Sequence, residues 1–156
     1  ENHDLFKIRP EVYTKLERFF EDKMLKNIAV SKKPDFNLIN ATLFDYQKEG
    51  VAFALFKKNV IIADEMGLGK TLQAIGTAVL KKNIFDFSKT LVTCPASLKE
   101  QWKNEIEKFS DEKAVIIQGK PQEREEQYKS DVFFYITNYE SVLRDRLVIN
   151  KKEFDF

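Results

Sequence analysis

The sequence predicts an α/β fold with a mainly parallel sheet, and three observations carry this prediction. Short apolar runs alternate with segments of helical spacing from Leu43 onward; the runs are residues 60–63, 91–94, 114–117 and 132–136. Short apolar strands separated by helices are typical of a parallel sheet that is covered on both faces. The 156-residue chain is 43% hydrophobic and has 14 Phe against five Gly, which is enough apolar material for one packed domain.

The segments between these runs predict the helices. Helical spacing links Tyr46, Gly50, Phe53 and Ala54, and further helical segments cover residues 70–82, 98–109 and 121–129. The stretch Ser97-Leu98-Lys99-Glu100 has the spacing of a capping box, in which a serine side chain caps the helix that follows. We therefore expect Ser97 to cap the helix predicted over residues 98–109.

Residues 1–41 differ from the rest of the chain and predict a helical extension followed by a connector. Pro10 suits the first turn of a helix. Apolar residues then recur near helical spacing, at Val12, Leu16, Phe19, Phe20 and Met24. Residues 31–40 include Pro34 and predict a connector. We divide the chain into this extension, residues 1–41, and an α/β unit, residues 42–156.

Charge and cysteine content exclude several classes of protein. The 26 Lys and Arg against 25 Asp and Glu give a net charge of +1, so a DNA contact would need a local patch. One Cys (Cys94) and one His (His3) cannot build a disulfide framework or a structural zinc site. No apolar run approaches the ~20 residues that span a bilayer. With a polar start that does not resemble a signal peptide, we expect an intracellular protein without a membrane partner.

The most informative segment is Asp64-Glu65-Met66-Gly67-Leu68-Gly69-Lys70-Thr71, between an apolar run and a helical segment. Glycines there let backbone N–H groups point at phosphate oxygens, and the helix N-terminus adds partial positive charge. All eight residues are candidates for nucleotide binding, with Lys70 on the β- and γ-phosphates of ATP and the Thr71 hydroxyl on Mg²⁺. Asp64 replaces the first Gly of the general pattern, so the pattern alone also permits a glycine-rich turn with a surface lysine.

This string resembles motif I of the Swi/Snf-family ATPases in helicase superfamily 2, where Asp holds the same first position. Residues 43–50 resemble the upstream glutamine motif of that family, with Phe44 in place of its Arg. Residues 95–102 resemble motif Ia, with Lys99 in place of a common Leu, and residues 136–140 resemble motif Ib. The resemblance implies a P-loop NTPase with a RecA-like three-layer fold, of which this chain is the N-terminal part of the first lobe.

The resemblance also implies roles for single residues. Gln47 would recognise adenine, because an amide can pair with both N6 and N7 of that base. Motifs Ia and Ib would contact the backbone of double-stranded DNA through Ser97, Lys99, Thr137, Asn138 and Tyr139. A solvated position for Gln47 or Lys99, and helix caps at Ser97 and at residues 137–139, remain as alternatives.

The family pattern continues with an Asp-Glu-Ala-His box, whose Asp holds Mg²⁺ and whose Glu orients the attacking water. Residues 153–156 resemble the lead into that box, so we expect the chain to stop before it and before the second lobe. The expected function is ATP binding in a DNA-dependent ATPase that moves on double-stranded DNA and remodels protein–DNA complexes, with this part alone inactive. Alternatives are another superfamily 2 motor, such as a restriction-type translocase or a helicase, or a partner-binding module with a vestigial nucleotide loop.

Overall fold

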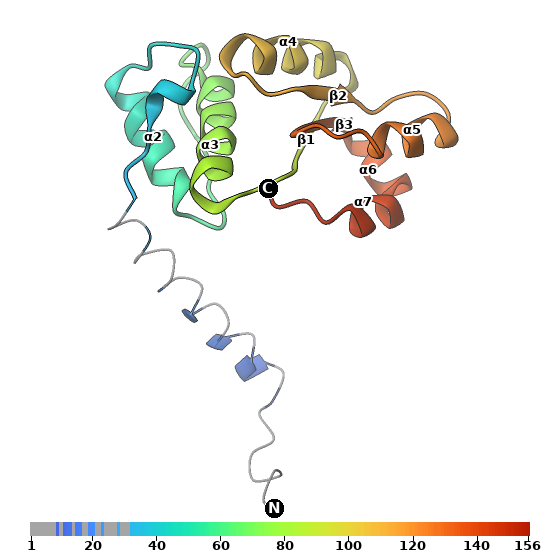
Figure 1. Cartoon of the computed structure of the whole chain (residues 1–156), viewed down its shortest axis with the longest axis horizontal. Helices are drawn as coiled ribbons and strands as arrows, with labels where there is room; N and C mark the ends of the chain where they lie inside the picture. Colours follow the sequence, from blue (N-terminus) through green and yellow to red (C-terminus); the bar gives the residue numbers. More distant parts are fainter. Residues whose placement is uncertain are drawn as a thin grey trace, which may run out of the picture.

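The computed structural model describes residues 9, 11–13, 15–16, 19–20, 23, 28 and 32–156. Figure 1 shows a pair of helices beside a small sheet that carries the remaining helices. The elements in chain order are η1 (Phe36–Leu38), α2 (Asp45–Leu55), α3 (Lys70–Phe85), β1 (Thr90–Cys94), η2 (Ala96–Leu98), α4 (Lys99–Phe109), β2 (Ala114–Ile116), α5 (Pro121–Tyr128), β3 (Phe134–Asn138), α6 (Tyr139–Arg144) and α7 (Arg146–Lys152).

The predicted N-terminal helix is only partly covered by the described residues. Val12, Leu16, Phe19 and Phe20 have helical backbone and exposed side chains, whereas Met24 lies outside the described residues. The boundary at residues 41 and 42 remains a prediction.

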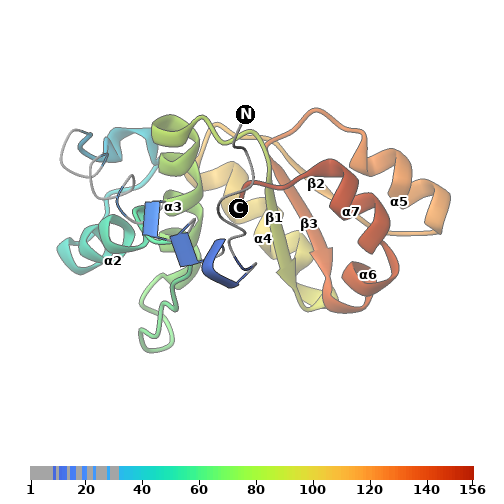
Figure 2. The same cartoon turned by 90° about the horizontal axis from the view of Figure 1, so that it is seen from below.

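The sheet has three parallel strands in the order β1-β3-β2, which confirms three of the four predicted strands. Its two faces carry different helices, as Figure 2 shows. Phe134 and Ile136 of β3 pack with Ile106 of α4 on one face. Tyr135, which alternates with them, packs with Tyr128 of α5 on the other face. Helices therefore cover both faces of a parallel sheet, as the α/β prediction requires.

The prediction of a strand at residues 60–63 is wrong. These residues have no regular structure, and the side chain of Ile61 is 90% exposed. A strand needs a neighbour for its backbone hydrogen bonds. On the side of β1 away from β3, the C-terminal residues form such bonds in place of residues 60–63. The Asp155 N–H donates to the Lys89 carbonyl (3.0 Å) and the Leu91 N–H donates to the Phe156 carbonyl (2.7 Å).

A cavity of about 440 Å³ lies between residues 60–62 and the sheet side of the molecule. Val60 and Ile62 line it together with residues of α3, and Trp102 and Phe156 line it as well. The apolar run therefore faces an open space rather than a paired strand.

The start of one predicted helix differs from the prediction, and two further helices were not predicted. The Ser97 side chain does not cap α4; the Leu98 N–H donates to the Pro95 carbonyl (2.9 Å) and closes the 3₁₀ turn η2, after which α4 begins at Lys99. The backbone thus satisfies this turn without a side-chain cap. The helices α6 and α7 follow β3 directly and were not predicted.

The helices α2 and α3 pack side by side and bring their N-termini together. Val51 and Leu55 of α2 meet Leu80 and Ile84 of α3 in one buried cluster. Gly76 of α3 permits a close approach by the preceding connector, because a Cβ there would lie 2.7 Å from Ile39 Cδ1. This packing places the glutamine motif of α2 next to the loop that precedes α3.

Candidate nucleotide-binding site

The loop before α3 has the backbone shape that a phosphate site requires. Gly67 and Gly69 have φ of +87° and +75°, in the region that favours glycine, and Gly69 is the N-cap of α3. A Cβ at Gly69 would also lie 2.5 Å from the Gln47 amide nitrogen. The free N–H groups at the start of the 16-residue helix α3 are next to this loop, which is the arrangement that binds anions.

Lys70 is folded back across the loop. Its Nζ donates to the carbonyl oxygens of Asp64 (2.9 Å) and Glu65 (2.8 Å). A phosphate bound at the loop would compete with these carbonyls for the ammonium. Thr71, the next residue of α3, is half-buried and lines the 440 Å³ cavity beside Lys70.

Gln47 is buried against the loop, which rules out a solvated position for it, and adenine recognition remains a prediction. Its Oε1 accepts from the Phe44 N–H (3.0 Å), and its Nε2 donates to the Leu68 carbonyl (3.1 Å). The Tyr46 hydroxyl donates to the same carbonyl (3.2 Å). The glutamine motif is therefore attached to the loop midway between Gly67 and Gly69.

Asp64 has a structural partner that the sequence did not reveal. Its Oδ2 accepts from Nε2 of Gln73 (2.6 Å), which is fully buried one turn into α3. Gln73 packs against Gly50 of α2, where a Cβ would lie 2.2 Å from the Gln73 Oε1. Asp64, at the position of the first Gly in the general pattern, thus attaches the start of the loop to α3 through Gln73, which in turn packs against α2. The one available signal was a glutamine three positions after Lys70, on the side of α3 that faces α2.

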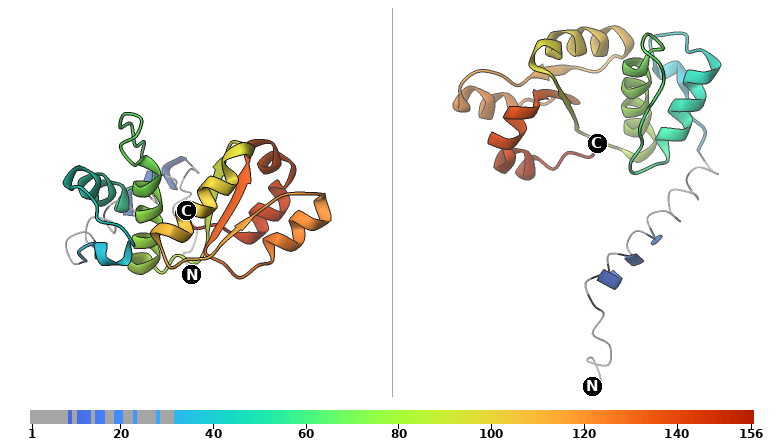
Figure 3. Two further views of the ribbon diagram at one scale, coloured as in Figure 1. Left: turned by 90° about the horizontal axis from the view of Figure 1, so that it is seen from above. Right: turned by 180° about the vertical axis from the view of Figure 1, so that it is seen from behind.

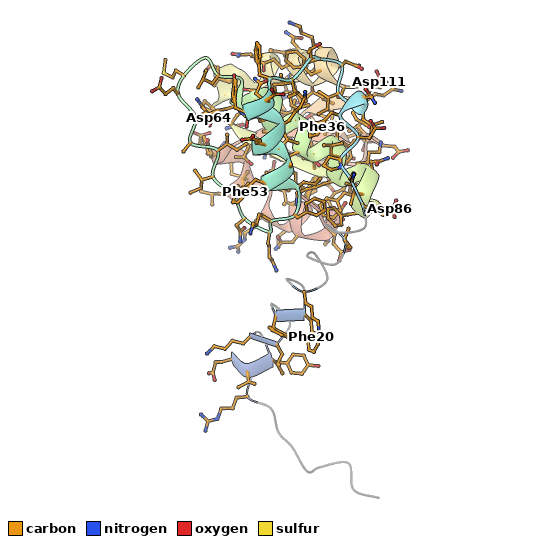
Figure 4. The ribbon with its side chains drawn as sticks, turned by 90° about the vertical axis from the view of Figure 1, so that its left-hand side faces the viewer. Phe20, Phe36, Phe53, Asp64, Asp86 and Asp111 are labelled. Atoms are coloured by element: carbon orange, nitrogen blue, oxygen red, sulfur yellow. The ribbon has the colours of Figure 1, made fainter. Side chains whose placement is uncertain are left out.

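Two other loop residues, Glu65 and Met66, project into solvent. The Glu65 carbonyl accepts from Lys70, and its side chain is exposed. This agrees with a backbone role for Glu65 rather than a catalytic one. Figure 4 labels Asp64 at the loop and Phe53 on α2.

The predicted DNA-contacting residues gather at the carboxyl ends of β1 and β3, which pair at Cys94 and Asn138. Ser97 and Tyr139 are exposed and Asn138 is half-buried, so all three are accessible at this edge. The Asn138 Oδ1 accepts from the Ser141 hydroxyl (3.0 Å), and its Nδ2 donates to Glu140. These bonds fix the turn from β3 into α6.

Lys99 and Thr137 are placed differently from their predicted direct contact with DNA. Lys99 is buried, and its Nζ donates to the carbonyl of Ile117 at the end of β2 (3.0 Å). Thr137 is fully buried within β3. The Lys99 ammonium therefore bonds to a backbone carbonyl at this edge, and the Thr137 hydroxyl lies beneath the surface, so neither group is exposed to a phosphate.

A buried ion pair connects two of the helical segments next to this sheet edge. Arg124 of α5 donates from Nε (2.8 Å) and Nη2 (2.6 Å) to the two carboxylate oxygens of Asp145, and from Nη1 to the Gly119 carbonyl (2.8 Å). The hydrogen bonds to Asp145 raise the pKa of the Arg124 guanidinium, and burial raises the pKa of the neighbouring Tyr128 phenol. Both groups therefore keep their ordinary protonation state at neutral pH. The pair joins α5 to the junction between α6 and α7.

No helix in the part of the chain that the structure describes is long and apolar enough to cross a membrane.

Comparison with known proteins places this site in a family. The family model described as the SNF2-related domain matches residues 46–156. Helicase SWR1 of Kluyveromyces lactis is 35% identical over 140 residues, which cover 83% of this chain and 9% of that protein. The TATA-binding protein-associated factor MOT1 of Saccharomyces cerevisiae is 34% identical over 150 residues, which cover 81% of this chain and 8% of that protein.

A solved structure agrees with these relatives. The Sulfolobus solfataricus SWI2/SNF2 ATPase core in complex with dsDNA matches with a TM-score of 0.64 and 30% identity, over 74% of this chain and 25% of that one. The chain thus spans less than a tenth of the two relatives and a quarter of the solved structure. The family match begins at Tyr46 and contains the whole loop, both strand ends and the ion pair. This chain belongs to the SNF2-related domain family.

Proposed function

We propose that this chain is the nucleotide-binding part of a DNA-dependent ATPase motor. In the whole protein, ATP hydrolysis would drive movement on double-stranded DNA and remodelling of protein–DNA complexes. The observation that carries the proposal is the loop at the N-terminus of α3, where two glycines of positive φ and the Lys70 ammonium meet free helical amides. Membership of the SNF2-related domain family supports the same activity.

The loop residues suit ATP with Mg²⁺. The Lys70 ammonium is suited to the β- and γ-phosphates once it leaves the carbonyls of Asp64 and Glu65. The Thr71 hydroxyl, adjacent to Lys70, is an oxygen ligand of the kind that Mg²⁺ prefers. When bound, Mg²⁺ would neutralise charge on the phosphates. Gln47 is suited to the base because the amide retains one N–H and one lone pair beyond the two bonds it makes in the protein.

The DNA contact is proposed for the exposed residues at the carboxyl ends of β1 and β3. Ser97, Asn138 and Tyr139 offer a hydroxyl, an amide and a phenol, which are common partners of DNA phosphates. Lys99 and Thr137 are assigned to the support of this edge, since both are buried. The side chains of Ser97, Asn138 and Tyr139 are uncharged, so the salt-dependent part of DNA affinity would have to come from Lys or Arg elsewhere in the protein.

The proposal is tested by calorimetric titration of the chain with Mg·ATP. Lys70→Ala should weaken binding by about 10- to 150-fold, because a hydrogen bond to a charged group contributes about 1.5–3 kcal/mol. Lys103→Ala, which removes a lysine from the surface of α4, serves as the matched control and should bind as the unchanged chain does. Equal affinities for all three proteins would remove the site assignment.

A second measurement separates binding from turnover. The chain alone should show no DNA-stimulated phosphate release, because the family's second lobe would supply an arginine finger, and that residue by itself can contribute ~10³–10⁵ in rate. A longer protein with both lobes should release phosphate in the presence of DNA and lose this activity on Lys70→Ala. DNA-dependent hydrolysis by the 156-residue chain would contradict the proposed division of catalytic residues.

A further inference from the structure

A carboxylate lies among the residues that are proposed to contact DNA. Residues 95–98 and 138–140 lie at the carboxyl ends of β1 and β3, and Glu140 is the one member of the two groups with a charged side chain. Figure 2 shows α6, which contains Glu140, beside the arrowheads of these strands. Glu140 is exposed, whereas the nearby Lys99 is buried and donates to the Ile117 carbonyl. The exposed charge within these two groups is therefore negative, although the proposed ligand is an anion.

The Glu140 carboxylate accepts a hydrogen bond from the amide of Asn138. Asn138 Nδ2 donates to Glu140, and Asn138 Oδ1 accepts from the Ser141 hydroxyl (3.0 Å). Because Ser141 is buried, its bond fixes the amide with the NH₂ group on the side of the carboxylate. A DNA phosphate also accepts N–H bonds. A phosphate at this NH₂ group would lie next to the carboxylate, and two like charges that close repel each other.

Arg144 offers the carboxylate a second partner. It is exposed and lies four residues after Glu140 in α6, and Glu followed by a cation at this spacing is a favourable pair on a helix surface. The Asn138 hydrogen bond lowers the pKa of the Glu140 carboxyl most, and the charge of Arg144 lowers the pKa further. The carboxylate is therefore ionised at neutral pH and is attracted by both groups. A move from Asn138 toward Arg144 would free the amide and still leave the carboxylate a partner.

We propose that Glu140 is an internal competitor of DNA at Asn138. Its carboxylate holds the amide in the free protein, and a backbone phosphate displaces the carboxylate toward Arg144. This inference rests on the proposed function and adds a residue that limits DNA affinity at this edge. Binding at Asn138 then exchanges one anion for another instead of filling a free donor.

The test titrates the isotope-labelled 156-residue chain with one duplex DNA at low ionic strength, where contacts to phosphates are strongest. Amide chemical shifts report both the affinity and the place of binding. Glu140→Gln keeps the size of the side chain and removes its charge. Duplex affinity should therefore rise by about 2- to 5-fold, the range for an exposed pair of charges.

Glu105→Gln is the matched control. Glu105 also accepts from an exposed amide, that of Gln101 (2.9 Å), but the pair lies on the surface of α4. The variant makes the same change in net charge and should leave duplex affinity unchanged. The same gain in both variants would overturn the competitor in favour of a general effect of net charge.

A double-variant cycle tests the second partner. Arg144→Gln removes the cation toward which the carboxylate moves, so duplex affinity should fall. Combined with Glu140→Gln, the same substitution should change affinity little, because no carboxylate is left to displace. An equal fall in both backgrounds would show that Arg144 contacts DNA itself and would overturn the exchange.

The spectra also separate this inference from the proposed function. If the duplex shifts the Asn138 amide but Glu140→Gln brings no gain in affinity, the competitor is wrong and the DNA contact stands. If the duplex shifts no resonance of residues 97 and 138–139, the proposed DNA contact is wrong and the competitor with it. Unchanged shifts elsewhere in each variant confirm that the fold is intact.

Discussion

The two halves of the molecule are stabilised in different ways. The sheet half, residues 90–156, has a continuous ladder of parallel strands with a core on each face. The loop half, residues 36–85, has two packed helices, and its ligand-binding segment between them has no regular structure. Figure 3 shows the two halves side by side. The strand ends proposed to contact DNA are held mainly by the backbone bonds of the sheet, whereas the proposed nucleotide loop is held by a few side chains that bind its carbonyls.

A shared apolar core and a small number of polar contacts connect the halves. Ile75, Ala78 and Val79 of α3 belong to the same buried cluster as residues of α4 and β3. The Asn40 N–H donates to the Phe109 carbonyl (2.8 Å), and its side chain donates to Asp111 (2.8 Å). Lys82 of α3 forms an ion pair with Glu112 (2.7 Å). Segments that must rearrange around a ligand belong to the less stable part of a protein, and the loop half has that character. Substitutions in the two halves are therefore expected to differ in their effects on the free energy of unfolding and on nucleotide affinity.

The largest expected effect is in the sheet half, on replacement of Arg124. Arg124→Leu leaves the Asp145 carboxylate, whose side chain is 8% exposed, without its partner. Breaking a buried ion pair in this way costs about 3–5 kcal/mol, measured as the free energy of unfolding in urea. Lys129→Ala removes a lysine from an exposed pair with Glu126 and should change little. Similar losses in the two variants would contradict the assigned role of the Arg124–Asp145 pair.

A smaller effect is expected in the loop half, on Gly50→Ala. The new Cβ would displace Gln73, whose amide then loses Asp64, at a cost of about 1–3 kcal/mol for overpacking. Mg·ATP affinity should also fall, because Asp64 begins the loop. Combining Gly50→Ala with Gln73→Ala restores room and should recover stability but not affinity. Additive losses in the double variant would show that Gly50 and Gln73 act independently.

The smallest effect is expected at the C-terminal contact with β1, on Asp155→Asn. Burial raises the pKa of the Asp155 carboxyl, but the N–H groups of Ser88 and Lys89 and the Ser88 hydroxyl outweigh it and lower the pKa below the ordinary 3.8. A lowered pKa in the folded state adds stability above the ordinary pKa, and that stability is lost as the pH falls through the folded value. The variant should be less stable than the unchanged chain near neutral pH, and the difference should shrink in acid. A difference independent of pH would show that the charge of Asp155 is not involved.

The sequence predicted those features that depend on local pattern. The apolar runs of β1 and β2, the start of α3 at Lys70 and the start of α5 at Pro121 agree with the structure because periodicity, glycine and proline act within one segment. The position of Gln47 at the loop was also predictable, because it belongs to a motif of fixed spacing.

The remaining features depend on tertiary neighbours that no local pattern contains. Residues 60–63 are apolar enough for a strand, yet a strand forms only beside a free edge, and Phe156 is bonded to Leu91 at the edge of β1. From the sequence alone, Lys99 is compatible with a solvated lysine. Its burial depends on the Ile117 carbonyl at the end of β2, which accepts from its ammonium. The link between Asp64 and Gln73 depends on the packing of α2 against α3 at Gly50.

The strand order β1-β3-β2 also determines when the sheet half can fold during synthesis. The strands β1 and β2 do not pair with each other, and both pair with β3: Thr90 and Ala114 each align with Phe134. Of the three strands, β3 is synthesised last. Until Phe134–Asn138 emerges, neither earlier strand has a backbone partner. The helices α2 and α3 have all their shared contacts available much earlier. Since pairing of distant segments is slow, the loop half should acquire protection from amide hydrogen exchange before the sheet half does.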